Sequence, residues 1–200
     1  MYPFRYTNWT DRGAMLTFID QVSFAHLFIQ TPEGPMVAHA PLIVTAEGNL
    51  RFHLARANRL TAHLDGAQVL ASIAGADAYV SPDWYGSDDQ VPTWNYVAVE
   101  VTGIVRRVSG ADLVQILDTL SAMHEARLVP KKPWTRGKMS AGLFDGMQKA
   151  ICGFEMTVED LKGTRKVGQN KSPAEIESAA AALDAAGKSE MAALMRSACV

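Results

Sequence analysis

The sequence predicts a mainly β protein with peripheral helices, arranged as a nearly closed barrel and followed by a helical tail. Short runs of β-forming residues, separated by tight turns, dominate residues 23–163. Closing such strands into a barrel removes their exposed edges, which favours a barrel of about six strands. After Ser172 the composition changes to an alanine-rich pattern that is typical of helices.

The first three strands follow from short apolar runs. Residues 24–30 (FAHLFIQ) and 36–45 (MVAHAPLIVT) are joined by the turn sequence TPEG, which predicts a β-hairpin. Residues 49–54 (NLRFHL) come after another short turn and add a third strand. The pattern therefore predicts mostly antiparallel pairing at the start of the barrel.

Three further strands complete the predicted barrel. The fourth comprises residues 69–74 and 78–80, with an interruption or a bulge expected near Gly75. Residues 96–108 (YVAVEVTGIVRRV) alternate regularly and form the longest predicted strand, and residues 151–163 (ICGFEMTVEDLKG) return to strand character.

Helices are expected in two places. Residues 109–112 (SGAD) are a helix start, and apolar residues on one stripe continue the pattern to Arg127. In the tail, Pro173 suits a first helical turn, and Gly187 divides the alanine-rich run into two helices. We therefore divide the chain into a barrel domain over residues 1–170 and a helical extension over residues 171–200.

Composition and charge exclude several classes of protein. The formal charge of −2 and the pI near 6.2 give no general attraction to nucleic acid or to an anionic membrane. No apolar run approaches the ~20 residues of a membrane span, and the N-terminus lacks the apolar core of a signal peptide. A cytoplasmic protein without membrane contact is expected, and Cys152 and Cys199 are better explained as free thiols than as a disulfide.

The most informative segment is residues 81–96 (SPDWYGSDDQVPTWNY), which combines aromatic residues with Pro, Gly and Asp. Such a segment breaks regular structure, yet it holds two of the four Trp residues of the chain. Flat aromatic side chains on a polar loop suit the stacking of a planar ligand. The alternative is a long hairpin connection that Trp84 and Trp94 pin to the end of the barrel.

Two basic segments indicate a phosphate site. Residues 52–59 (FHLARANR) run from a strand end into a helix that we expect to begin near Asn58, so that Arg56 would lie beside a helix N-terminus. A guanidinium at such a place suits a dianionic phosphate. Residues 163–170 (GTRKVGQN) form the second segment. In both cases solvated basic side chains remain the alternative.

A third candidate is the segment from His39 to Leu42, where Pro41 falls inside an apolar strand. Proline removes a ladder donor, so it is confined to an edge, a bulge or a place where a ligand approaches. Backbone groups freed by a break at Pro41 could bind the polar edge of a flavin ring. The alternative is a barrel edge with a surface histidine.

Several blocks of the sequence together resemble the PaiB-like family of FMN-binding negative transcriptional regulators, which have the FMN-binding split β-barrel fold. The blocks are HAPL (39–42), FHLARAN (52–58), AYVSPDWY (78–85), VPTWNY (91–96), GFEM (153–156) and KVGQN (166–170). They occur in the family's order and cover most of the chain. Two departures are HAPL in place of HLPL and KVGQN in place of KLSQN, so that Gly168 can offer only backbone contacts.

The resemblance implies a homodimer that binds FMN near the subunit interface. We expect the phosphate at Arg56 and Asn58, with Lys166 and Gln169 contributed by the other subunit, and the ring between the segment 39–42 and the loop 81–96. The complete set of expected FMN-binding residues is His39, Ala40, Pro41, Leu42, His53, Arg56, Asn58, Ser81, Trp84, Tyr85, Trp94, Asn95, Lys166, Gln169 and Asn170.

The use of the FMN is left open by the sequence. The family label favours a flavin-linked negative transcriptional regulator, although the overall charge does not support direct DNA binding. An FMN-dependent oxidoreductase or flavin reductase of the split-barrel class is the alternative, and its chemistry would be that of the cofactor. A metal or haem binder is disfavoured, because the five His residues show no tight ligand spacing.

Overall fold

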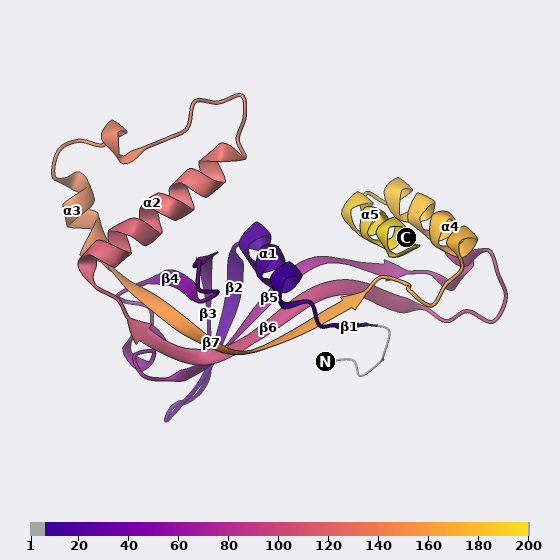
Figure 1. Cartoon of the computed structure of the whole chain (residues 1–200), viewed down its shortest axis with the longest axis horizontal. Helices are drawn as coiled ribbons and strands as arrows, with labels where there is room; N and C mark the ends of the chain where they lie inside the picture. The colour runs from indigo at the N-terminus through magenta and orange to yellow at the C-terminus, as the bar shows by residue number, and fades with distance from the viewer. Residues whose placement is uncertain (1–6, 200) are drawn as a thin grey trace. The chain divides into compact units, whose positions relative to one another are not determined.

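The computed structural model describes residues 7–199, with side chains up to Ala198. Seven strands form one sheet in the order β1-β7-β4-β3-β2-β5-β6, and β7 also pairs with β6 (Figure 1). The additional pairing closes six strands into a ring, which confirms the barrel class. The strands are β1 (Asn8–Trp9), β2 (Phe24–Thr31), β3 (Gly34–Val44), β4 (Leu50–Ala55), β5 (Gln68–Val80), β6 (Thr93–Arg107) and β7 (Ile151–Lys166).

Five α-helices and four short 3-10 turns accompany the strands in the described part of the chain. The helices are α1 (Arg12–Val22), α2 (Gly110–Ala126), α3 (Leu143–Gln148), α4 (Pro173–Ala185) and α5 (Ser189–Arg196). The turns are η1 (Thr61–His63), η2 (Pro82–Tyr85), η3 (Arg136–Lys138) and η4 (Ser197–Cys199). No helix among the described residues is long and apolar enough to cross a membrane.

The chain divides into two compact units. The ring unit comprises Arg12–Ile73 and Glu100–Leu161, and the terminal unit comprises Met1–Asp11, Ala74–Val99 and Lys162–Val200. The ring unit contains β2, β3, β4, α1, α2 and α3. The terminal unit contains β1, η2, α4 and α5.

The predicted β2–β3 hairpin is confirmed. Its two-residue turn is held by the Thr31 hydroxyl, which donates to the Gly34 carbonyl at 2.8 Å and accepts from the Glu33 N–H at 3.2 Å. Antiparallel pairing extends from Thr31 and Gly34 to Phe24 and Pro41. The turn sequence therefore sets the register of the first two ring strands.

Pro41 does not break β3, contrary to expectation. It pairs with Phe24 of β2, and the pairing of β3 with β4 begins at the next residue, Leu42 opposite Phe52. The Leu42 N–H donates to the Ser23 carbonyl at 3.0 Å, so the Pro41 nitrogen faces the opposite edge of the strand. The missing N–H lies just before the β4 ladder starts, where it costs no ladder hydrogen bond.

The core of the ring unit is built around two aromatic side chains. Phe52 and Phe154 are fully buried and stack with their ring centroids 5.6 Å apart. Burying a side chain of this size contributes roughly 1.5–3 kcal/mol to folding. Strands β6 and β7 approach closely at Gly103. A Cβ at this position would be 2.0 Å from the Thr157 carbonyl oxygen. Only glycine allows this approach of the two strands.

Four local expectations need correction. Helix α1 was not predicted, since RGAMLTFIDQV contains a glycine and several β-formers, and packing of Met15 and Ile19 outweighs those propensities. Strand β5 is continuous through Gly75, although its buried positions change parity between Ile73 and Ala78. Helix α3 and turn η3 lie in a connection for which no element was predicted.

The fourth correction concerns the helix expected near Asn58. The chain forms a turn there, in which the Asn58 side-chain oxygen accepts from the Leu60 N–H at 2.9 Å, and only the three-residue turn η1 follows. Asn and Asp side chains stabilise such turns as readily as they cap helices. Asn58 therefore stabilises a turn and not the start of a helix.

The terminal unit confirms the predicted helical tail. Ser172 and Glu175 form a capping box at the start of α4, and Pro173 occupies the first turn. Gly187, in the left-handed region at φ +74°, separates α4 from α5. Small residues such as Ala179, Ala180 and Ala192 are fully buried, which lets these two helices pack closely (Figure 1).

Candidate functional site

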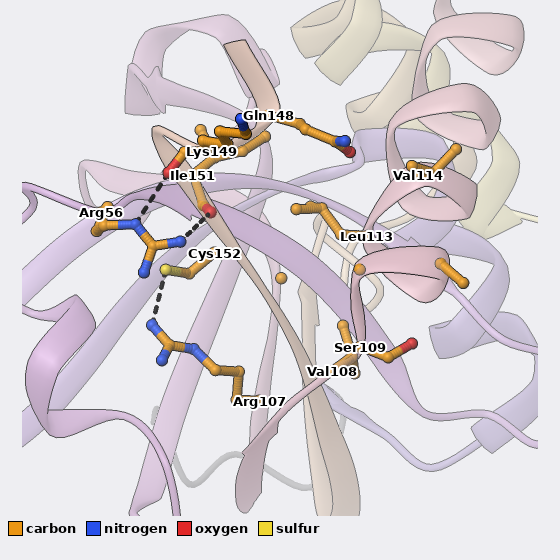
Figure 2. A pocket seen from close by; sticks show the side chains of 13 residues that line it. Arg56, Arg107, Val108, Ser109, Leu113, Val114, Gln148, Lys149, Ile151 and Cys152 are labelled. Atoms are coloured by element: carbon orange, nitrogen blue, oxygen red, sulfur yellow. Dashed lines mark hydrogen bonds between the residues drawn. The ribbon is translucent and has the colours of Figure 1, made fainter. Parts of the chain in front are cut away.

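Eight of the fifteen residues expected to bind the cofactor line three cavities, each within one unit. The first, here named the Arg56 cavity, has a volume of about 480 Å³ and lies in the ring unit. Its lining residues are Arg56, Arg107, Val108, Ser109, Gly110, Ala111, Leu113, Val114, Gln148, Lys149, Ile151, Cys152 and Gly153. Figure 2 shows this site from close by.

Backbone carbonyls hold the Arg56 guanidinium in place. Its Nε donates to the Lys149 carbonyl at 2.9 Å and its Nη2 to the Ile151 carbonyl at 3.4 Å (Figure 2). The Arg56 backbone N–H also donates to the Ala150 carbonyl at 2.7 Å. A guanidinium has five N–H donors, and these contacts fix the group while using two of them.

A second guanidinium faces the same cavity. Arg107 Nη2 donates to the Cys152 Sγ at 2.8 Å (Figure 2). The Arg107 guanidinium also lies 6.0 Å from the ring centroid of Phe154. Cys152 is buried and is a free thiol, as predicted. The side chain of Cys199, the other predicted thiol, lies outside the described residues.

The N-terminus of α2 completes the Arg56 cavity. Ser109 is its N-cap, and the Ser109 hydroxyl accepts from the Asp112 N–H at 3.3 Å. Gly153 allows Val108 and the first turn of α2 to approach β7, because a Cβ there would be 2.8 Å from Val108 Cγ2 and 3.3 Å from Leu113 Cβ. The helix N-terminus expected beside Arg56 is therefore present, but α2 supplies it instead of the segment after Asn58.

The electrostatics of the Arg56 cavity favour an anion. Arg56, Arg107 and Lys149 are cationic, and none of the described residues that line the cavity carries a carboxylate. The positive end of the α2 dipole adds to this potential. Such a set of donors fits the phosphate of a phosphorylated cofactor.

The second cavity, here named the Lys166 cavity, lies in the terminal unit and has a volume of about 260 Å³. It brings together residues from the aromatic loop and from the KVGQN segment. Its lining residues are Thr7, Tyr85, Val91, Thr93, Asn95, Lys166, Gly168, Gln169, Asn170 and Lys171.

The two lysines of the Lys166 cavity contact a hydroxyl and an aromatic ring. Lys166 Nζ donates to Thr93 Oγ1, and burial lowers the pKa of Lys166. Lys171 Nζ lies 4.8 Å from the centroid of the buried Tyr85 ring, whose pKa is raised by burial and by Glu175. The buried Asn95 Nδ2 has only Met195 Sδ, at 3.4 Å, as its recorded acceptor.

The KVGQN turn is held by its own glutamine. Gln169 Oε1 accepts from the Val167 N–H at 3.0 Å, and Gln169 Nε2 donates to the Arg165 carbonyl. Gly168 has φ +82°, a conformation that favours glycine. The Gln169 side chain thus shapes the turn that presents Lys166 and Asn170.

A third cavity of about 240 Å³, here named the His53 cavity, joins Pro41 and His53 to α2. His53 Nδ1 is buried without a hydrogen-bond partner among the described residues, and burial lowers the pKa of His53 so that its imidazole is neutral near pH 7. The remaining lining residues are Leu117, Leu120, Ser121, His124, Glu125 and Trp134.

Several expected residues line none of these three cavities. Ala40 and Leu42 are fully buried in the ring core, and His39 is exposed with its ring 4.8 Å from that of His26. Asn58 is committed to its turn. In the aromatic segment, Ser81 precedes η2, Trp84 is half-buried in η2, and Trp94 is 56% exposed, edge-on to Tyr79.

Sequence reasoning missed part of the Arg56 cavity. Arg107, Lys149 and the start of α2 are distant from Arg56 in sequence, and ring closure brings them together. Ser109 was recognised as a helix start, but nothing in one sequence pairs that start with Arg56. The Lys166 cavity was easier to anticipate, since its two main segments stand out by composition.

Comparison with known proteins decides the family. A family model described as "Putative FMN-binding domain" matches residues 1–160. The chain belongs to this family. It is also 28% identical over 176 residues to "Protease synthase and sporulation protein PAI 2" of Bacillus subtilis (strain 168), covering 86% of this chain and 84% of that protein. The resemblance stated from the sequence motifs is thereby confirmed.

Solved structures of low sequence identity share the fold of this family member. An FAD- and haem-binding protein from Mycobacterium smegmatis matches with a TM-score of 0.59 at 14% identity, covering 81% of this chain and 74% of that one. The flavocytochrome Anf3 from Azotobacter vinelandii matches with a TM-score of 0.60 at 14% identity, covering 84% and 73%. These likenesses support the split-barrel fold.

Proposed function

We propose that this protein binds FMN as a homodimer and acts as a flavin-linked negative transcriptional regulator. The observation that carries the FMN assignment is the Arg56 cavity, in which three cations and a helix N-terminus converge without a lining carboxylate. Membership of the family supports FMN as the cofactor. The regulatory role is supported by the similarity to the Bacillus subtilis sporulation protein.

The residues of the Arg56 cavity have separable tasks in this proposal. Arg56, fixed by two carbonyls, orients the phosphate, and Lys149 and Arg107 balance its charge. Bound FMN would supply redox chemistry through its ring system. We place Lys166 and Gln169 of the partner subunit at the same cofactor, near the subunit interface.

Exposed apolar side chains support the homodimer. Phe24 and Phe28 of β2 are 46% and 41% exposed, and Val37, which pairs with Phe28 across the hairpin, is 36% exposed. Contiguous apolar surface of this kind is typical of protein interfaces. Light scattering should therefore report a dimer at micromolar concentration, and a monomer would contradict this part of the proposal.

Ligand selectivity tests the phosphate site. Arg56→Ala should weaken FMN binding by roughly tenfold or more, because a hydrogen bond to a charged group contributes about 1.5–3 kcal/mol. Riboflavin, which lacks the phosphate, should bind nearly as before. Arg59→Ala is the matched control, since Arg59 is an exposed arginine on the same turn that does not line the cavity.

A second variant separates binding from folding. Lys149→Ala removes an exposed side chain of the cavity and should also weaken FMN selectively without changing the melting temperature of the cofactor-free protein. Equal weakening of FMN and riboflavin in both variants would show that these residues support the fold. Rapid reduction of the bound flavin by NADH or NADPH would instead identify an oxidoreductase.

A further inference from the structure

The connection between α2 and β7 carries the sequence KKPWTRGK at residues 131–138. It contains four cationic residues and no acidic one. Segments of this length and composition are typical of nucleic-acid-binding patches. The formal charge of −2 conceals the patch, because net charge averages over all 200 residues.

The patch is on the surface of the ring unit. Lys131, Lys132, Arg136 and Lys138 are all exposed. In Figure 1 the connection from α2 through η3 to α3 stands away from the sheet of the ring unit. A long partner could therefore reach these side chains without displacing the core.

Two of the cations anchor the segment to α2. Arg136 lies 2.6 Å from an Asp118 carboxylate oxygen, and its guanidinium is 4.6 Å from the ring centroid of Phe144. Lys131 pairs with Glu125, whose carboxylate also accepts from the Trp134 N–H at 2.7 Å. Exposed ion pairs of this kind contribute little to stability, so a phosphate can compete for the cations.

The other two cations have no close carboxylate partner in the described part of the chain, although the positive charge of Lys138 helps to lower the pKa of Glu125. Among the described residues, neither Lys132 nor Lys138 forms an ion pair with a carboxylate, and the recorded contact of Lys138 Nζ is the Pro133 carbonyl at 3.2 Å. The hydroxyl of Thr135, which is exposed between them, is a further donor suited to phosphate.

The distribution of apolar residues favours nucleic acid over an anionic membrane. Segments that bind a bilayer surface interleave their cations with exposed aliphatic side chains. Here the exposed aliphatic residues Leu128, Val129 and Leu143 lie outside residues 131–138. Within the patch the large apolar side chain is Trp134, which is only partly exposed and lines the His53 cavity, so the patch offers a partner cations and hydroxyls instead of apolar surface.

We propose that residues 131–138 form a contact surface for the phosphate backbone of duplex DNA. This inference names the partner of the proposed regulatory function and rests on it. Each lysine that meets a phosphate releases a condensed counterion, so binding should weaken steeply as salt concentration rises. Contacts to the phosphate backbone would supply binding affinity but would not distinguish one base sequence from another.

The test compares two double variants of the full chain. Lys132→Gln with Lys138→Gln removes the two lysines of the patch that form no ion pair with a described residue, and Lys162→Gln with Lys188→Gln removes two exposed lysines elsewhere. Both variants change the formal charge from −2 to −4, by loss of two positive charges. Fluorescence anisotropy with a labelled duplex is measured at several salt concentrations, and flavin absorbance is recorded for the same samples.

The patch variant should lower the slope of log affinity against log salt by about 1.8, at 0.9 for each lost phosphate contact, while the control keeps the parent slope. Equal slopes in the two variants, or binding to anionic vesicles with no binding to the duplex, would overturn the proposal. If the protein binds FMN normally but does not bind the duplex, the DNA proposal is overturned and the FMN assignment stands. Loss of FMN binding in the parent protein would instead contradict the cofactor assignment.

Discussion

The Arg56 cavity and the Lys166 cavity both contain cationic side chains, but different structural features hold those side chains in place. Both are lined by cations, and neither has a carboxylate among its described lining residues. In the Arg56 cavity, backbone carbonyls and a helix N-terminus fix the donors, and the parts are distant in sequence. In the Lys166 cavity, short segments with their own turn contacts present the lysines.

Each cavity also depends on one glycine for a different physical reason. Gly153 is needed because a side chain would collide with Val108. Gly168 is needed because the backbone is in the left-handed region at φ +82°. Close packing therefore requires the glycine of the Arg56 cavity, whereas backbone conformation requires the glycine of the Lys166 cavity. Substitutions at glycines and at the N-terminal carboxylates of α2 and α4 test this difference.

The largest effect is expected at the crossing of β6 and β7. Gly103→Ala would place a Cβ 2.0 Å from the Thr157 carbonyl oxygen, and backbone cannot move away as a side chain can. Overpacking a rigid site costs roughly 3 kcal/mol or more. Urea unfolding should show this loss, and the matched control Gly110→Ala, where no atom lies within 4 Å, should be much milder. Similar midpoints for the two variants would disprove the close-packed crossing.

Gly153→Ala should cost less, about 1–3 kcal/mol, because the nearest atom is the end of the Val108 side chain. Since α2 must shift to make room, FMN affinity should fall together with stability. Titration of FMN at a temperature well below the unfolding transition measures the second effect. Unchanged affinity would mean that the start of α2 does not contribute to the phosphate site.

Gly168→Ala should cost roughly 1–2 kcal/mol through its positive φ. Asparagine tolerates this conformation better, so Gly168→Asn should recover part of the loss. The family pattern expected serine here, and Gly168→Ser should resemble alanine. Thermal unfolding measures all three variants. If alanine and asparagine lower the melting temperature equally, the cause would instead be contact of the new side chain with Met195 Cε, which lies 3.4 Å from the position of a Cβ at residue 168.

The sequence predicted the ring strands and the tail because their signals are local. Period-two alternation marks β6, and the Pro-Glu turn marks the β2–β3 hairpin. It could not predict α1, whose helix depends on packing of Met15 and Ile19, nor the turn at Asn58, since asparagine caps turns and helices alike. The sequence could not assign Arg107 and Lys149 to the same cavity as Arg56, because only closure of the ring brings the three residues together.

The smallest predicted effect compares the N-caps of the two units. At α4, the Ser172 backbone N–H and the Ser87 hydroxyl donate to Glu175 at 2.8 and 2.7 Å, and they lower the pKa of Glu175 to about 2. At α2, the Ser109 hydroxyl donates to Asp112 at 2.5 Å and lowers the pKa of that carboxyl. Both carboxylates lie near the positive end of a helix dipole.

A carboxyl with a depressed folded pKa stabilises the protein above its unfolded pKa, and this contribution is lost as the pH falls. For Glu175 the loss should extend from the ordinary value of 4.5 down to about 2. Glu175→Gln keeps the shape of the capping box but cannot ionise, so its melting temperature should be below that of the parent at pH 6 and should converge with it near pH 2. Asp112→Asn should show the same direction in the ring unit. Because the backbone N–H of Ser172 and the hydroxyls of Ser87 and Ser172 together lower the pKa of Glu175 to about 2, the gap should be wider for Glu175→Gln. A gap that is constant with pH would show that the side chain acts by packing instead of charge.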